Sequence, residues 1–239
     1  MSFCELLQWD SEFFGLTIAR IMVHPLTSSI VAQIDYWSNQ ESVDCLYLLV
    51  DSSDAETVYV AESHGFRLVD IRITLEAIVN EQKVGVDPCV RTVEPRDIDL
   101  LRTIAANSFR ESRFYTDHQF PREKCDELYA TWIENSCDGW ADAVLVYSPE
   151  KTPLGFVSCH LKPDFGQIGL VGVRSDIQGR GVGKKLLTSA LHWFGQHERK
   201  RVRVVTQGRN IRAQKIYQKS GFVTSEVQLW YHRWYRNCT

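Results

Sequence analysis

Three glycines at alternate positions, Gly179, Gly181 and Gly183, stand where a strand-like segment gives way to a helix-like one. Glycine inside regular structure costs roughly 0.5–1 kcal/mol relative to alanine, so we expect the backbone here to need room. The first amides of a helix lack intrahelical acceptors and carry the positive end of the helix dipole. Without Cβ atoms in the way, phosphate oxygens can contact those amides directly. The spacing therefore predicts a phosphate-binding turn, to which Arg180, Lys184 and Lys185 add positive charge.

Two common phosphate-binding motifs do not fit this turn. No Gly-Lys-Ser/Thr follows at the spacing of a nucleoside triphosphate loop, and the glycines do not have the Gly-x-Gly-x-x-Gly spacing of a dinucleotide fold. The ligand that the turn predicts is therefore neither a simple nucleoside triphosphate nor NAD.

The neighbouring segments predict the elements that position the turn. Residues 167–173 alternate like a strand, and the apolar residues between 182 and 194 share one helical face. A further strand is expected over 201–206. Asn210 is expected to cap a short helix that ends before Gly221. These elements follow in the order strand, glycine turn, helix, strand and helix. The turn therefore lies late in an α/β domain.

Two motifs together resemble the GNAT N-acetyltransferases. The first is Gln-x-x-Gly-x-Gly, beginning at Gln178, and the second is Asn-x-x-Ala-x-x-x-Tyr-x-x-x-Gly-Phe, beginning at Asn210. The resemblance implies an α/β (α+β) GNAT fold, a mixed curved sheet flanked by helices, with acetyl-CoA as co-substrate and no metal. The cofactor-binding residues that it implies are Val171, Val173, Gln178, Gly179, Arg180, Gly181, Val182, Gly183, Lys184 and Asn210.

The resemblance covers the second part of the chain, which suggests a division into domains. We expect an N-terminal α/β domain over 1–80, a linker over 81–89 and the GNAT domain over 90–239. Residues 58–77 and 215–234 both read as a helix, Gly-Phe and a strand. The N-terminal domain is therefore interpreted as a degenerate GNAT-like half, with a chance likeness as the alternative.

The chemistry implied is transfer of an acetyl group from a thioester to an amine. By its position in the second motif, Tyr217 matches the family's general acid, and we expect it to donate a hydrogen bond to the sulfur as the C–S bond breaks; packing of its ring is the alternative. For the general base the resemblance suggests Asp70, in the strand after the first Gly-Phe, and an exposed strand carboxylate is the alternative. His118 and His160 remain open as other bases.

A helix region rich in arginine and aromatic residues is the candidate binding site for the substrate that accepts the acetyl group. Other stretches, among them 106–114 and 129–136, resemble acetyltransferases that act on nucleotide-linked amino sugars. This resemblance implies that Arg113, Phe114 and Tyr115 bind the substrate, with ordinary packing as the alternative. The expected acceptor is a dTDP-linked 4-amino-4,6-dideoxyhexose used in surface polysaccharide synthesis. A GNAT enzyme for a protein N-terminus or a small amine, and a non-catalytic acyl-CoA-binding module, stay open.

Composition limits the partners. The chain has 239 residues, 44% hydrophobic and 24% charged, with a formal net charge of −3. That charge gives no global attraction to nucleic acid or to an anionic membrane, and no apolar run is long enough to span a bilayer. Seven scattered cysteines without a Cys-x-x-Cys pair favour reduced thiols in the cytoplasm over a zinc site. The sequence leaves a homodimer open.

Overall fold

The computed structural model describes residues 3–79 and 87–235, so most of the expected linker lies outside the described residues. The chain forms two compact units that do not follow the expected boundary. Unit 1 combines residues 1–72, 112–124 and 227–239, and unit 2 combines 73–111 and 125–226. The unit division differs from the sequence pattern because two long strands, β4 (Arg67–Ile78) and β10 (Val223–Trp234), each contribute one part to each unit.

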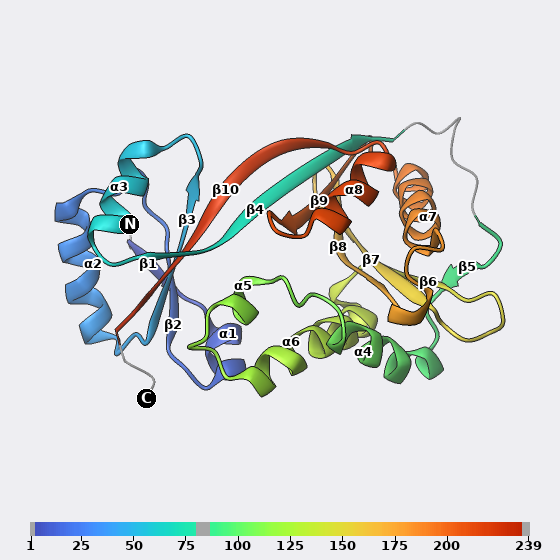
Figure 1. Cartoon of the computed structure of the whole chain (residues 1–239), viewed down its shortest axis with the longest axis horizontal. Coiled ribbons are helices and arrows are strands. Elements are labelled where there is room, and N and C mark those ends of the chain that lie inside the picture. Colours follow the sequence, from blue (N-terminus) through green and yellow to red (C-terminus); the bar gives the residue numbers. More distant parts are fainter. Residues whose placement is uncertain (1–2, 80–86, 236–239) are drawn as a thin grey trace. The chain divides into compact units, whose positions relative to one another are not determined.

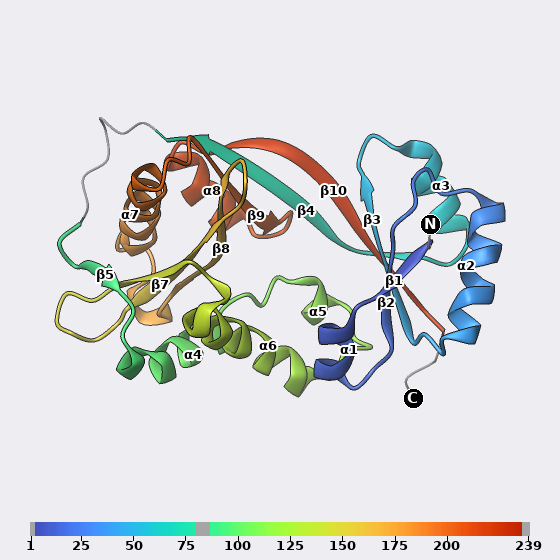
Figure 2. The same cartoon turned by 180° about the vertical axis from the view of Figure 1, so that it is seen from behind.

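The described strands form one mixed sheet with the order β1-β2-β3-β10-β4-β9-β8-β7-β6-β5, flanked by helices. The α/β fold expected from the sequence is thus confirmed (Figures 1 and 2). The elements that belong to unit 1, besides parts of β4 and β10, are β1 (Cys4–Leu6), α1 (Gln8–Phe14), β2 (Ile18–Ile21), α2 (Ser28–Gln40), β3 (Cys45–Asp51), α3 (Ala55–Ser63) and α5 (Arg113–Thr116).

The strands of unit 1 are covered on both faces. Residues of β3 alternate, so that Leu46 and Leu48 pack with Val31 and Ile34 of α2, whereas Tyr47 faces the aromatic side chains of the opposite face. This alternation follows from the two-residue period of a strand. A strand buried on both faces reads as an almost continuous apolar run.

Unit 2 holds the segments with the two motifs. Its elements, besides parts of β4 and β10, are β5 (Val90–Thr92), a 3-10 turn (Pro95–Asp97), α4 (Ile98–Ala106), α6 (Arg122–Asn135, whose first turn belongs to unit 1), a π-helical turn (Ser136–Trp140), β6 (Ala143–Tyr147), β7 (Gly155–Leu161), β8 (Gly166–Val173), α7 (Val182–Gln196), β9 (Arg201–Gln207) and α8 (Ile211–Lys219).

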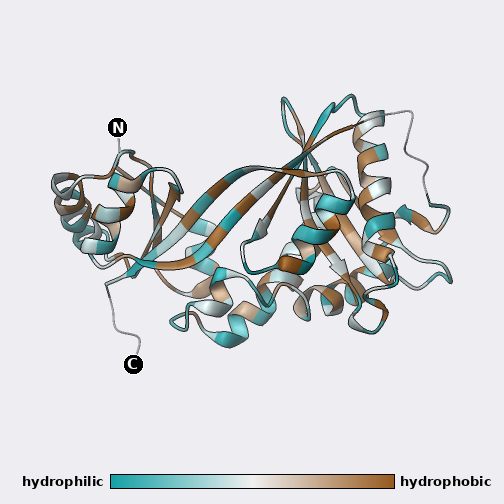
Figure 3. Cartoon of the chain, turned by 45° about the horizontal axis from the view of Figure 1, so that its top comes forward, coloured by the Kyte–Doolittle hydropathy of each residue, from teal (hydrophilic) through white to brown (hydrophobic). Residues whose placement is uncertain are grey.

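The helix α7 forms because its apolar residues recur on one face (Figure 3). Leu186, Leu187, Ala190 and Phe194 are fully buried there, in a cluster with Val157 and other apolar residues of the strands. This core fixes α7 against the sheet and thereby sets the position of the glycine turn at its start. The expected helix and its apolar face are confirmed, and the helix ends at Gln196.

The expected internal repeat is more regular in the structure than in the sequence. The strand, helix and strand β3-α3-β4 have 7, 9 and 12 residues, and so have β9-α8-β10. Both helices begin with a side-chain cap, from Asp54 and Asn210, that accepts the amide hydrogen of the third residue beyond it. Both end before a glycine with positive φ, Gly65 at +81° and Gly221 at +90°. The equal lengths, caps and turns support the degenerate half, which stays a proposal.

Candidate functional site

The glycine turn leaves the start of α7 open. Gly179 and Gly181 have φ values of +84° and +82°, and a Cβ built on either would meet nothing within 4 Å. The helices α2 and α8 are capped by the side chains of Thr27 and Asn210, whereas α7 has Gly181 at its cap and no side-chain acceptor. The free helix amides and the empty space in front of them therefore fit the pyrophosphate of acetyl-CoA.

Gly183 has a different role from the one that the sequence suggested. A Cβ on Gly183 would lie 2.6 Å from Ile216 Cδ1, because the first turn of α7 packs closely against α8. The third glycine thus permits helix packing rather than ligand approach. The first two glycines permit the backbone conformation and the open space.

Two polar contacts connect the glycine turn to β8 and α8. Gln178 Nε2 donates to the carbonyl of Val173 at 3.0 Å, and Arg212 of α8 donates to Gln178 Oε1. The side chains of Arg180 and Lys184 are exposed beside the turn, where they add positive charge for a phosphate ligand. Gln178 is therefore placed to hold the turn against β8.

Two other residues at the start of α7, Lys185 and Val182, have side chains that contact the protein itself. Lys185 lies 3.1 Å from an Asp87 carboxylate oxygen and donates to the Tyr147 hydroxyl at 3.1 Å. The Val182 side chain is buried, so this residue offers a ligand only its backbone.

Next to the turn, β8 separates from its parallel neighbour. The parallel register described for β8 and β9 runs from Gly166 with Val202 to Ile168 with Val204, yet β8 continues to Val173. Over the rest of β8 the edge toward β9 has no paired residue in the described register. The backbone around Val171 therefore offers hydrogen-bonding groups to an extended ligand, as the resemblance implies for the pantetheine arm.

Tyr217 lies in α8 and belongs to the same hydrophobic cluster as the apolar side of α7. It is 6% exposed, and its ring packs edge-on against Phe222 with ring centroids 5.9 Å apart. Burial raises the pKa of Tyr217 well above the usual value for a phenol. The hydroxyl is thus protonated at neutral pH, as a proton donor must be, and its role stays a prediction.

Asp70 and the predicted acceptor-binding residues lie in unit 1, whereas the alternative base His160 lies in unit 2. Asp70 is 4% exposed on β4, and its Oδ1 accepts the amide hydrogen of Ile71 at 2.8 Å. The Arg113 guanidinium carbon lies 5.0, 4.2 and 4.5 Å from the ring centroids of Tyr47, Phe114 and Trp230. Arg113 is thus surrounded by aromatic rings of its own unit.

Phe114 and Tyr115 are 2% and 6% exposed. Phe114 stacks on Phe14 with centroids 5.3 Å apart, and Arg122 lies over the Tyr115 ring at 4.4 Å. These contacts favour the packing alternative for both rings, and their contact with a substrate stays a prediction.

Sequence reasoning missed one buried ionisable pair in unit 1. His232 is 1% exposed, its Nδ1 lies 2.7 Å from Asp117 Oδ2, and Trp234 Nε1 donates to the same oxygen at 2.9 Å. Burial lowers the pKa of His232. Burial alone would raise the pKa of Asp117, but the hydrogen bonds from His232 and Trp234 lower it. The partners are far apart in sequence, so no local pattern indicated them.

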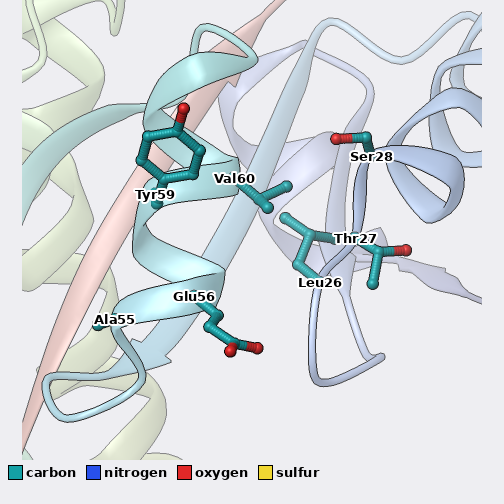
Figure 4. A pocket seen from close by; sticks show the side chains of 7 residues that line it. All are labelled: Leu26, Thr27, Ser28, Ala55, Glu56, Tyr59 and Val60. Carbon is teal, nitrogen blue, oxygen red and sulfur yellow. The ribbon is translucent and has the colours of Figure 1, made fainter.

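A pocket of about 430 Å³ opens in unit 1 between the start of α2 and the helix α3 (Figure 4). In the internal repeat this place corresponds to the space between α7 and α8. The connection leading to α2 has no glycine, and Glu56 lines the pocket at the repeat position of Arg212 in α8. A carboxylate and a side-chain cap in place of free amides do not suit a pyrophosphate.

Two further observations concern the described residues as a whole. None of their helices has both the length and the apolar character needed to cross a membrane. Within the same residues, no three His, Cys, Asp or Glu side chains gather in a way that could hold a metal ion.

Comparison with known proteins agrees with this geometry. Residues 105–222 match the acetyltransferase (GNAT) family. The chain is 28% identical over 236 residues to a dTDP-fucosamine acetyltransferase of Escherichia coli O6:H1, covering 96% of this chain and 97% of the relative. It is 25% identical over 141 residues to the spore coat polysaccharide biosynthesis protein SpsD of Bacillus subtilis, covering 59% of this chain and 49% of that protein.

Solved structures show the same fold. A GCN5-related N-acetyltransferase from Sphaerobacter thermophilus aligns with a TM-score of 0.70 at 17% identity, covering 98% of this chain and 76% of that one. A tandem GNAT protein from the clavulanic acid biosynthesis pathway aligns with a TM-score of 0.61 at 13% identity, covering 94% and 77%. The motifs, the open start of α7, the separated strands and these matches lead to one conclusion: the chain carries a GNAT acetyltransferase domain, and the protein is an acyltransferase.

Proposed function

We propose that the protein transfers the acetyl group of acetyl-CoA to the amino group of a nucleotide-linked amino-deoxy sugar, of the dTDP-4-amino-4,6-dideoxyhexose type, for surface polysaccharide synthesis. The observation that carries this proposal is the similarity to dTDP-fucosamine acetyltransferase, which extends over 96% of the chain and so includes both units. The similarity to a spore coat polysaccharide biosynthesis protein supports the same pathway class.

The residues of unit 2 supply the cofactor site. The backbone at Gly179 and Gly181 and the first amides of α7 would hold the pyrophosphate, with Arg180 and Lys184 adding charge. Acetyl-CoA supplies the activated thioester. Tyr217 keeps its proton at neutral pH because it is buried, and it would donate a hydrogen bond to the departing sulfur.

Unit 1 would hold the nucleotide end of the acceptor. The expectation rests on the resemblance, which places Arg113, Phe114 and Tyr115 on the substrate side. Asp70 stays the base that the resemblance suggests. The aromatic surroundings of Arg113 are compatible with a role in orienting a planar, anionic ligand, although the same contacts also stabilise unit 1.

The test compares acceptors. We expect kcat/KM for the dTDP-linked 4-amino-6-deoxyhexose to exceed that for the free amino sugar by about 10² or more, because binding energy from the remote nucleotide orients the amine. A panel of dTDP- and UDP-linked amino sugars, a peptide with a free N-terminus and a polyamine completes the assay. Equal kcat/KM for the linked and free sugars, or faster acetylation of the peptide or polyamine, contradicts the proposal and favours a protein or small-amine substrate.

A further inference from the structure

A bulge interrupts β8 close to the place where this strand leaves β9. The antiparallel register of β7 and β8 shifts between Val157 and Cys159, where β8 has one extra residue. Ser158 Oγ fills the irregularity by accepting the amide hydrogen of Leu170 at 2.8 Å. The parallel pairing with β9 ends at Ile168, beside the same bulge. Bulges occur preferentially next to active sites, where they redirect backbone and side chains.

The imidazole of His160 lies over the glycine of this bulge. A Cβ on Gly169 would stand 2.5 Å from His160 Nε2 and 2.7 Å from Ser158 Oγ, so a larger residue here would displace these side chains. His160 is half-buried and Gly169 is exposed. The histidine from β7 therefore occupies the space in which a side chain of β8 would otherwise stand.

One hydrogen bond fixes which nitrogen of His160 has a lone pair. Nδ1 lies 3.1 Å from the carbonyl oxygen of Trp140, which can only accept, so Nδ1 carries the hydrogen. Nε2 is then the basic nitrogen. Ser158 Oγ lies 3.5 Å from Nε2, at the long limit of a hydrogen bond.

The distance along β8 places His160 near the reacting end of the cofactor. From Val173, next to the glycine turn, back to Gly169 an extended strand covers about 13 Å, at ~3.3 Å per residue. The pantetheine arm between the phosphate and the sulfur has about as many chain atoms as four peptide residues. An arm lying along the free edge of β8 therefore brings its thioester to the level of Gly169.

We propose that His160 is the general base of the reaction, with Nε2 taking the proton from the attacking amine. This inference rests on the proposed function, and it assigns to a residue of unit 2 the role that the resemblance suggests for Asp70. The amine nitrogen forms the new C–N bond, the C–S bond breaks and the amine proton passes to Nε2, while the Tyr217 hydroxyl donates a hydrogen bond to the departing sulfur and keeps its own proton. Coenzyme A leaves as the thiolate, which takes its proton from solvent, and His160 releases its proton to solvent, so that both residues regain their initial states.

The charges around His160 agree with this role. Burial lowers the pKa of His160, the Trp140 carbonyl raises it, the Lys162 ammonium lowers it and the Asp142 carboxylate raises it. The β8 residues beside it, Gln167 and Gly169, carry no titratable group. The imidazole is therefore neutral at neutral pH, and activity should fall as the pH drops through its pKa.

The variant that tests the proposal is His160→Asn, because the asparagine amide can still donate to the Trp140 carbonyl. We expect kcat/KM to fall by about 10²–10⁴-fold, with partial rescue by added imidazole and unchanged acetyl-CoA affinity by calorimetry. The matched control is His197→Asn at the end of α7, whose Nδ1 also contacts a backbone carbonyl, that of Trp193 at 2.8 Å, but which is exposed. This control should keep wild-type activity.

A second readout needs no acceptor. Diethylpyrocarbonate acylates neutral imidazole nitrogens, and mass spectrometry can follow His160 and His197 in one sample. We expect acetyl-CoA to protect His160 and to leave the reaction at His197 unchanged. Equal reaction of His160 with and without acetyl-CoA overturns the proposal.

Failure of the proposed substrate class and failure of His160 as the base give different results. If the wild-type enzyme acetylates none of the nucleotide-linked sugars, the proposed function fails, and the protection experiment still decides whether His160 faces the thioester. If the sugars are acetylated and His160→Asn keeps more than a third of kcat with chemistry rate-limiting, the base assignment is wrong. Loss of activity in Asp70→Asn alone would give the role to the carboxylate.

Discussion

Replacing Gly181 with valine tests whether the glycine turn binds acetyl-CoA. Gly181 has φ +82° and its added side chain would meet no protein atom within 4 Å, so the only cost within the protein is backbone strain. A left-handed conformation costs a residue with a Cβ at least 1–2 kcal/mol. For a chain of this size that lowers Tm by about 2–8 °C, at 2–4 °C per kcal/mol. The folded variant therefore remains measurable.

Gly65→Val is the matched control. Gly65 has φ +81° and an equally open Cβ position, but it follows α3 in unit 1 and is not part of the turn at the start of α7. Both variants should lose the same stability. Only Gly181→Val places two methyl groups in front of the amides of α7, so only this variant should lose cofactor affinity.

Thermal shift and calorimetry measure the difference. At a ligand concentration 100 times Kd, acetyl-CoA should stabilise the wild type and Gly65→Val by about 2.7 kcal/mol. If Gly181→Val weakens binding tenfold, the gain at the same concentration falls to about 1.4 kcal/mol. Unchanged acetyl-CoA affinity in folded Gly181→Val would refute the assignment of the turn as the pyrophosphate site.

Four further predictions follow from particular contacts. Tyr217→Phe keeps the buried ring, so we expect unchanged acetyl-CoA affinity and a kcat lower by about 10²–10⁴-fold; a loss of less than threefold in single-turnover assays would leave Tyr217 a packing residue. Asp97 is 2% exposed, binds Arg91 through both carboxylate oxygens at 2.6 and 3.0 Å and accepts the amide hydrogen of Glu94 at 2.8 Å, so Asp97→Ala should cost about 1–3 kcal/mol in urea unfolding because these donors lose a charged acceptor. The pKa of His232 in the folded protein is below its unfolded value of about 6.5. The unfolded state therefore binds more protons below that pH, and the free energy of unfolding should fall as the pH drops from 6.5. If the free energy of unfolding does not change between pH 7.5 and 5 and His232→Gln gives the same pH dependence, this prediction is wrong. Calorimetry should count one acetyl-CoA per chain, since the pocket beside α2 carries Glu56 in place of a basic residue; two equal sites would contradict the degenerate repeat.

Local sequence patterns correctly predicted the helices and strands around the two motifs in the second half of the chain. The strand, glycine turn and helix around Gly181, the cap at Asn210 and the strand after Gly221 all lie where residue patterns predict them, because each depends on neighbours within a few positions. The family follows from two motifs whose spacing is set by those same elements. The acyltransferase family could therefore be predicted from local sequence, without any tertiary contact.

Only the tertiary structure decided which residues come into contact around these elements. It showed that Gly183 gives room to Ile216 rather than to a ligand, because α7 and α8 cross there. It enclosed Arg113 between the neighbouring Phe114 and aromatic rings from two distant segments, β3 and β10, and it paired His232 with Asp117, 115 positions away. It also brought His160 over Gly169, a contact made across two strands and fixed by a bulge. Such contacts depend on strand register and helix packing, which no short stretch of sequence encodes by itself.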